Sequence, residues 1–175
     1  MKLRNEPKGK KMTRTAALEG LTVLDLGQIY NAPYAGFLMA NAGARVIKVE
    51  SLIGETLRSR GKSGSAAYAF TMLNQNKQSI SIDLKTEKGK ALFIDLVKLG
   101  LSAETLREVN PRLIYAAGSG YGQSGPQRDY LAMDITVQAM SGIMSATGIE
   151  GDPPLKSGVA LCDFLGGVHL YEIGR

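Results

Sequence analysis

The chain has 175 residues, of which 44% are hydrophobic and 21% charged, and its formal net charge is +5. This composition excludes disordered and collagen-like chains, and the length suits one domain with a single core. No apolar run approaches the ~20 residues of a membrane span, and no secretory signal is visible, so we expect a cytoplasmic protein, with a mitochondrial location as the alternative.

The positive charge lies at the beginning of the chain. Residues 1–14 hold six lysine or arginine residues and one glutamate, so the rest of the chain is close to neutral. No aromatic residue accompanies these charges to stack on a base. We therefore expect a disordered tail over 1–17 rather than a nucleic-acid surface, and a folded part over 18–175. The one cysteine, Cys162, cannot form an internal disulfide, which fits a reducing compartment.

The folded part begins with a strand, a helix and a second strand. An apolar run over 21–26 predicts a strand, and the residues after Pro33 favour a helix over 34–41 that Gly43 closes. Residues 45–50 predict the second strand. A short helix between two apolar strands favours a parallel, right-handed crossover. The pattern thus predicts an α/β fold with a Rossmann-like open parallel sheet and flanking helices.

The later elements continue this alternation. The sequence predicts a loop at 51–67, a half-buried strand at 79–84, a helix at 91–98 opened by 86–90, a short helix at 103–109 and a strand at 112–117. After a glycine loop at 118–125, it predicts a helix at 134–144 weakened by Gly142, a turn at 151–154 and an apolar core segment at 159–170.

The glycine loop admits three interpretations. Gly120, Gly122 and Gly125 match the spacing of a dinucleotide fingerprint after a predicted strand. In that fingerprint a helix opens at the loop, whereas here Pro126 and a polar stretch delay it, and the acidic residue expected ~20 positions later has no candidate. A dehydrogenase is therefore disfavoured. The loop either only reverses the chain, or lets a phosphorylated or thioester ligand approach the backbone.

Asp134 stands at the start of a predicted helix soon after this loop. A carboxylate is ionised at neutral pH and can attack a thioester without a general base, so Asp134 is a candidate nucleophile. Aspartate is also a common N-cap, and composition alone favours that role. Single cations such as Lys48, Arg58 and Lys77 are by default surface charges.

Four ordered blocks of the chain resemble the family III CoA-transferases, also called the CaiB/BaiF family. The blocks are residues 18–26 with Pro33 and 43–50, residues 73–80, residues 110–126, and residues 138–142 with 147–148. The resemblance covers nearly everything after residue 17, and it implies part of the α/β large domain of that family.

In this family an aspartate attacks an acyl-CoA thioester to give a mixed anhydride, and CoA then returns to form an aspartyl-CoA thioester that an acceptor acid resolves. By resemblance this aspartate is Asp134. The resemblance places CoA contacts at Arg58, Asn74, Gln75, Asn76, Lys77, Gly120, Tyr121 and Gly122. It implies acyl-CoA and a carboxylic acid as partners and a homodimer in the full-length form. CoA is then a substrate, and we expect no metal and no permanently bound cofactor.

Two alternatives stay within the same resemblance. The α-methylacyl-CoA racemases have a histidine just before the position of Asp134, where this chain has Met133, and an aspartate that matches Asp163. Without the histidine, racemisation lacks one of its acid/base groups, so the transferase is favoured. We expect His169, in an apolar stretch, to pack within a helix. The other alternative is a CoA-binding fragment without catalysis.

The chain departs from the family pattern in two places. Near Gly100 the family has a further strand and a further CoA contact, and beyond the position of Arg175 it continues with a second, smaller domain in interlocked subunits. We therefore interpret the chain as a partial large domain. Because an incomplete sheet exposes its edges, we expect weak independent stability or dependence on a partner.

Overall fold

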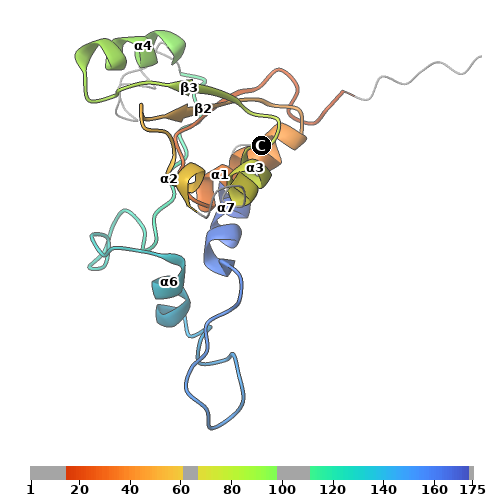
Figure 1. Cartoon of the computed structure of the whole chain (residues 1–175), viewed down its shortest axis with the longest axis vertical. Coiled ribbons are helices and arrows are strands. Elements are labelled where there is room, and N and C mark those ends of the chain that lie inside the picture. Colours follow the sequence, from red (N-terminus) through yellow and green to blue (C-terminus); the bar gives the residue numbers. More distant parts are fainter. Residues whose placement is uncertain (1–14, 61–66, 98–110, 174–175) are drawn as a thin grey trace, which may run out of the picture.

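The computed structural model describes residues 15–60, 67–97 and 111–173. At its centre lies a parallel sheet of three strands in the order β1-β2-β3 (Figure 1). The strands are β1 (Thr22–Asp25), β2 (Arg45–Glu50) and β3 (Gln78–Ser81). The register pairs Val23 with Val46 and Val49 with Ile80. The predicted α/β class with an open parallel sheet is confirmed.

Six helices are described, and they flank the sheet or extend away from it. They are α1 (Asn31–Asn41), α2 (Thr56–Ser59), α3 (Ala67–Asn74), α4 (Glu87–Val97), α6 (Asp134–Met140) and α7 (Leu161–Ile173). As predicted, Pro33 lies in the first turn of α1, where its missing N–H leaves no acceptor unpaired. Gly43 follows the helix with a φ of +99°, a backbone conformation that favours glycine.

Every residue of the central strand β2 after Arg45 is buried. Successive side chains of a strand point to opposite sides, so both faces of β2 are covered. On one face Val46 packs with Met39 of α1. On the other face Val49 packs with Phe93 of α4. Figure 1 shows α4 on one side of the sheet and α1, α3 and α7 on the other. Helices on both faces are the arrangement that parallel sheets require.

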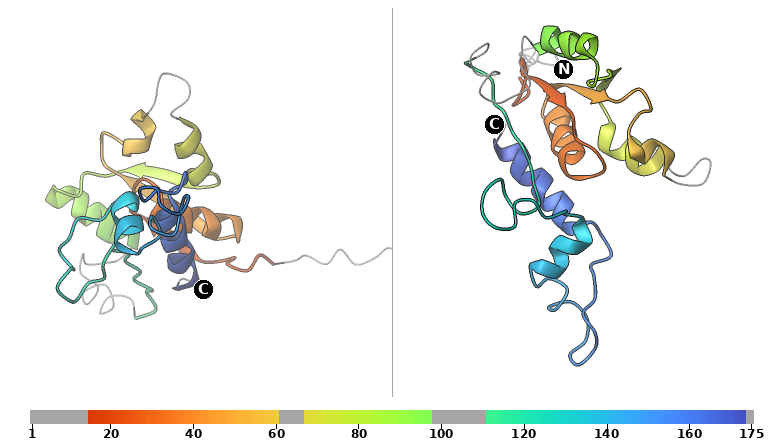
Figure 2. Two further views of the ribbon diagram at one scale, coloured as in Figure 1. Left: turned by 90° about the horizontal axis from the view of Figure 1, so that it is seen from below. Right: turned by 90° about the vertical axis from the view of Figure 1, so that its left-hand side faces the viewer.

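Helix α7 lies against α1 and connects the C-terminal part of the chain to the sheet (Figure 2). The ring of Tyr34 meets the ring of Phe164 edge-on, with 4.8 Å between centroids. At Gly167 a side chain would lie 2.6 Å from the backbone oxygen of Asn31. Glycine therefore permits the close approach of the two helices.

Three predictions about local structure are wrong. The segment 112–117 is not a strand; it is irregular, and Ile114 and Tyr115 are exposed. The segment 51–67 is not only a loop, because it contains α2. The helix predicted over 134–144 ends at Met140, because Gly142 adopts a φ of +82°. The apolar segment at 159–170 is largely the helix α7.

Several predicted features lie outside the described residues: the tail as far as residue 14, the short helix at 103–109 and the neighbourhood of Gly100. Within the described residues, none of the helices combines the length and the apolar character that a membrane crossing demands.

Candidate functional site

Asp134 is the first residue of α6, and its carboxylate reaches the beginning of α7. Its Oδ1 accepts hydrogen bonds from the backbone N–H groups of Cys162 (2.8 Å) and Asp163 (3.2 Å). Phe164 N–H bonds to Ala160 O, so Cys162 and Asp163 lie in the first turn of α7, where N–H groups have no partner inside the helix. Ala160, the residue before α7, has no side-chain acceptor for these N–H groups. The Asp134 carboxylate therefore caps the N-terminus of α7 in its place.

The alternative interpretation of Asp134 as the N-cap of its own helix, which composition alone favours, is wrong. The N-cap of α6 is Met133, whose N–H donates to the hydroxyl of Thr136 at 2.8 Å. The Asp134 side chain is thus not needed for the start of α6. It is half-buried and serves a helix that begins 27 residues later in the chain.

Gln138 fixes the other oxygen of this carboxylate. Its side-chain amide is buried, with 1% of the residue exposed. The oxygen Oε1 accepts the N–H of Ser157 at 2.8 Å, which determines the orientation of the amide. The nitrogen Nε2 then donates to Asp134 Oδ2 (2.5 Å) and to the carbonyl of Val159 (3.3 Å). Gln138 therefore holds Asp134 and the segment before α7 in one arrangement.

The Asp134 carboxylate accepts its hydrogen bonds from uncharged donors. Among the described residues, no lysine, arginine or histidine forms an ion pair with it. The N-terminal N–H groups of α7 and the Gln138 amide stabilise the anion instead. Burial, and then the nearby Asp134 carboxylate, raises the pKa of Asp163. Burial, followed by both carboxylates, raises the pKa of the Cys162 thiol.

The glycine loop, residues 118–125, folds back on the segment that precedes α6. Gly120 approaches Ala132 so closely that a side chain at position 120 would collide with it. The ring of Tyr121 packs edge-on against the ring of Tyr130, with 5.9 Å between centroids. Glycine at 120 is therefore required by its contact with the Ala132 methyl group, and the loop lies beside the helix that begins with Asp134.

A cavity of about 410 Å³ is lined by residues of this loop and of α7. Gly122 contributes to its wall in a left-handed conformation, with a φ of +83°. His169 is exposed and lines the same cavity, so the prediction that it packs within the helix is wrong. The remaining lining residues are Asn31, Ala117, Gly118, Ser119, Gln123, Gly166, Leu170 and Ile173.

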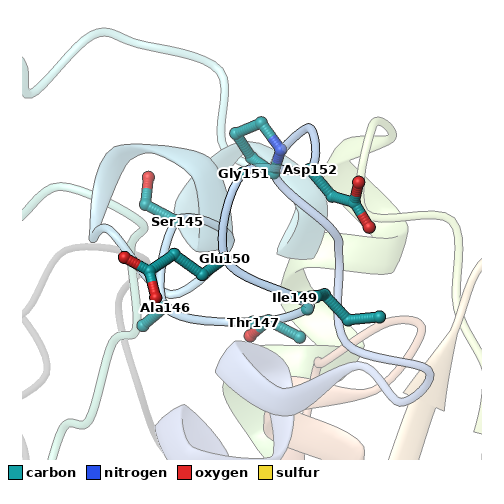
Figure 3. A pocket seen from close by; sticks show the side chains of 9 residues that line it. Ser145, Ala146, Thr147, Ile149, Glu150, Gly151 and Asp152 are labelled. Atoms are coloured by element: carbon teal, nitrogen blue, oxygen red, sulfur yellow. The ribbon is translucent and has the colours of Figure 1, made fainter.

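A second cavity, of about 380 Å³, lies within the loop 145–154 that follows α6 (Figure 3). The acidic residues Glu150 and Asp152 line it. Figure 3 shows their carboxylates on different sides of the loop. None of the predicted site residues belongs to this cavity.

Arg58, a predicted CoA contact, is paired within the chain. Its guanidinium donates to both carboxylate oxygens of Glu50, each at 2.7 Å, and lies 3.9 Å above the ring of Phe70. This bidentate pair lowers the pKa of Glu50 to about 2. The Arg58 side chain is nevertheless 45% exposed, so one face of a cation is open to solvent.

Lys77 and Asn74 form a buried polar cluster next to β1. The Lys77 side chain is 1% exposed and donates to Asp25 (2.8 Å), Pro33 O (2.7 Å) and Asn74 Oδ1 (3.0 Å). These three acceptors match the three protons of an ammonium group. Burial lowers the pKa of Lys77. In this structure the amine is therefore fully engaged within the chain.

Gln75 and Asn76 are the exposed members of the same segment. Asn76 has a φ of +62° and donates to Asn41 Oδ1 at 3.3 Å. A positive φ is tolerated by asparagine better than by most residues. The turn presents two amide side chains to solvent just beyond α3.

The structure thus gathers the predicted residues into two groups. One contains Arg58 and residues 74–77 near the sheet, and the other contains residues 120–122 and Asp134 near α7. Within the described part of the chain, no hydrogen bond or ion pair joins the groups.

Gln138 and the first turn of α7 belong to the surroundings of Asp134 but were not predicted as site residues from the sequence. A glutamine four residues after an aspartate on a predicted helix was the available signal for Gln138. No local signal pairs Asp134 with the amides of residues 162 and 163.

Comparisons with known proteins give the family of this chain. The chain is 39% identical over 172 residues to an acetyl-CoA:oxalate CoA-transferase of Acetobacter aceti, which covers 87% of this chain and 44% of the relative. It is 38% identical over 182 residues to a succinate–glutarate CoA-transferase of Agrobacterium fabrum, covering 89% of this chain and 45% of that protein. The chain therefore spans less than half the length of these relatives.

A solved structure supports the same relationship. The crystal structure of a CaiB/BaiF family protein from Brucella suis matches 91% of this chain and 48% of its own, with a TM-score of 0.84 and 36% identity. The family model described as CoA-transferase family III matches residues 18–172. This chain belongs to CoA-transferase family III.

Proposed function

We propose that this protein transfers CoA from an acyl-CoA thioester to an acceptor carboxylic acid, with Asp134 as the nucleophile. The observation that carries the proposal is the burial and hydrogen bonding of its carboxylate. It is half-buried, oriented by three neutral donors and not paired with a cation among the described residues. An ionised, oriented carboxylate can attack a thioester without a general base.

The proposed reaction exchanges CoA through two covalent states of Asp134. Attack on the donor thioester gives a mixed anhydride and CoA thiolate. The thiolate then attacks the aspartyl carbon, releasing the donor acid and leaving an aspartyl-CoA thioester. The acceptor acid attacks this thioester, and the released CoA takes over the acceptor acyl group. Membership of the family supports this course.

For CoA itself we propose the exposed groups of both clusters. The open face of Arg58 suits a phosphate, and the exposed Gln75 and Asn76 offer amide donors. The glycine loop, with Gly120, Tyr121 and Gly122, suits the pantetheine arm. Asn74 and Lys77 stay predictions as CoA contacts, although their described bonds tie them to each other and to α1.

The relatives suggest which acids to test first. The names of two relatives include oxalate and glutarate, both dicarboxylic acids. We propose short acyl-CoA donors and dicarboxylic acceptors for this protein. We also propose a homodimer, because large apolar side chains such as Leu131 (94% exposed) are left uncovered on this chain.

The proposal is tested by trapping the aspartyl intermediates. The protein is incubated with acetyl-CoA or succinyl-CoA, hydroxylamine is added, and the peptide containing Asp134 is examined by mass spectrometry. We expect an aspartyl hydroxamate at Asp134. In the Asp134→Asn variant we expect no adduct and at least a ~1000-fold loss of transfer to oxalate or glutarate. Asparagine keeps an oxygen for the N–H groups of Cys162 and Asp163, but its amide nitrogen faces the donor Nε2 of Gln138, so we expect some loss of thermal stability and the assay is run below the melting temperature of the variant.

Two further measurements, combined with the trapping experiment, distinguish the transferase from a CoA-binding fragment and from a racemase. A chain that binds CoA by calorimetry but never modifies the Asp134 peptide would be a binding fragment, and the transferase proposal would fail. Exchange of the α proton of an α-methylacyl-CoA into deuterated water, without an adduct on Asp134, would instead support the racemase alternative.

A further inference from the structure

The two oxygens of the Asp134 carboxylate have different surroundings. A carboxylate oxygen has two lone pairs. Oδ1 accepts from Cys162 N–H and Asp163 N–H, so both of its lone pairs are used. Among the described residues, Oδ2 accepts from Gln138 alone. The described hydrogen bonds therefore leave one lone pair of Oδ2 without a donor.

We infer that Oδ2 is the oxygen that attacks the donor thioester, whereas Oδ1 remains hydrogen-bonded to the N–H groups in the first turn of α7. These two N–H groups then form the oxyanion hole for each attack on the aspartyl carbon. This inference rests on the proposed function and goes beyond it, because it assigns a catalytic task to backbone groups of Cys162 and Asp163. Their N–H groups are free to act because they have no acceptor within α7.

The bonds formed and broken assign the charge to Oδ1 in two of the four steps. First, Oδ2 bonds to the donor acyl carbon, the carbon–sulfur bond breaks, and CoA leaves as thiolate. Second, the thiolate sulfur bonds to the aspartyl carbon, and an electron pair moves onto Oδ1. When this intermediate collapses, the bond from the aspartyl carbon to Oδ2 breaks, and Oδ2 leaves within the donor carboxylate.

The remaining steps restore the enzyme. Third, an oxygen of the acceptor carboxylate bonds to the aspartyl carbon, charge again develops on Oδ1, and CoA leaves as thiolate. Fourth, the thiolate attacks the acceptor acyl carbon, and the bond from that carbon to the bridging oxygen breaks. Asp134 is again a carboxylate, with Oδ1 retained and its second oxygen derived from the acceptor.

The first turn of α7 suits this task because it exists before the charge develops. The two N–H groups lie at 2.8 and 3.2 Å from Oδ1. They begin a helix of 13 residues, whose dipole favours negative charge at this end. Gln138 contributes as a positioning residue, because its buried amide holds the carboxylate in the orientation that puts Oδ1 on α7.

The test removes one donor and leaves the side-chain volume small. Cys162→Pro deletes the N–H at 2.8 Å from Oδ1, in the first turn of α7 where proline costs no helical hydrogen bond. Cys162→Ala is the matched control, because it changes the side chain and keeps the N–H. Rapid quenching with mass spectrometry then follows the aspartyl-CoA adduct, and exchange of labelled free CoA into acyl-CoA follows the first step alone.

We expect Cys162→Pro to form the aspartyl-CoA adduct about 100-fold to 1000-fold more slowly than Cys162→Ala, whereas the two variants exchange CoA at the same rate. A merely structural role would slow both steps together. If both variants form the adduct at the wild-type rate, the inference is overturned and the proposed function stands. If the wild type forms no covalent adduct at all, the proposed function itself fails.

A second measurement needs no variant and decides the matter if Cys162→Pro does not fold. In the wild-type protein, the amide protons of Cys162 and Asp163 are followed by nuclear magnetic resonance before and after the aspartyl-CoA adduct forms. We expect both to keep the low-field shift and slow exchange of hydrogen-bonded amides in the adduct. Loss of both signatures would show that Oδ1 has left α7, contrary to the inference.

Discussion

The sheet region, which comprises the described residues up to 97, pairs its buried carboxylates with cations, whereas Asp134 in the C-terminal region, residues 111–173, has no cation partner among the described residues. In the sheet region Glu50 is bound by Arg58, and Lys48 and Lys77 pair with Glu55 and Asp25. In the C-terminal region Asp134 is held only by neutral donors. In the sheet region, cations therefore neutralise carboxylates that support the fold. At Asp134, where we propose catalysis, uncharged donors leave the negative charge on the carboxylate.

The regions also differ in packing. The sheet region has two apolar clusters, one on each face of β2. In the C-terminal region α6 contacts α7, and apolar residues such as Leu131, Met133 and Ile135 are exposed. The stability of the C-terminal region should therefore depend on the contact of α7 with α1.

The largest expected effect is the loss of a buried cation in the sheet region. The side chains of Lys48 and Glu55 are each 1% exposed, and their charged atoms are 2.9 Å apart. Lys48→Met leaves the Glu55 carboxylate buried without its cation, so we expect the free energy of unfolding in urea to fall by about 3–5 kcal/mol. The control is Arg45→Met on the same strand, which is exposed and should cost less than about 1 kcal/mol. Equal stability of the two variants would show that the ion pairs do not support the sheet.

The next effect is a pH dependence that arises from Glu50. Arg58 lowers the pKa of this carboxyl from its ordinary value of 4.5 to about 2. An acid whose folded-state pKa is depressed stabilises the fold above its unfolded pKa, and this stabilisation disappears as the pH falls through the folded pKa. We expect a loss of at most about 3 kcal/mol between about pH 5 and pH 2, reduced by solvent screening at the exposed Arg58.

The contribution of Glu50 is isolated by comparison with Glu50→Gln. Other carboxyl groups titrate over the same range in both proteins, so the difference between their unfolding curves reports this group. We expect the variant to lose less stability on acidification than the wild type. Parallel curves would mean that Arg58 does not stabilise the Glu50 anion in solution.

The smallest expected effect concerns the junction of the two regions. Gly167→Ala puts a methyl group 2.6 Å from the backbone oxygen of Asn31, so α7 must move away from α1 at a cost of about 1–3 kcal/mol. Gly158→Ala is the control, because nothing lies within 4 Å of the added methyl group. We expect Gly167→Ala to increase amide hydrogen exchange in α6 and α7 more than in β2. Uniform exchange throughout would show that the two regions unfold as one unit.

The sequence determined the first half of the fold. Apolar runs at 21–26 and 45–50, with Pro33 and Gly43 between them, were sufficient for the strand, helix and parallel strand, because these signals are local and agree with one another. The segment 112–117 has the same kind of apolar residues but is not a strand. Strand formation depends on a neighbour that supplies hydrogen bonds, and the sequence of the segment does not specify one.

Family membership was also accessible from the sequence, because four blocks in order are a far more specific pattern than one glycine loop. The tertiary structure decided the surroundings of each candidate residue. Lys77 has three acceptors from three separate segments, and His169 lies beside the glycine loop. Asp134 accepts hydrogen bonds from the backbone N–H groups of residues 162 and 163. Residue types and their spacing are local properties, whereas a hydrogen bond between residues 28 positions apart exists only after the chain has folded.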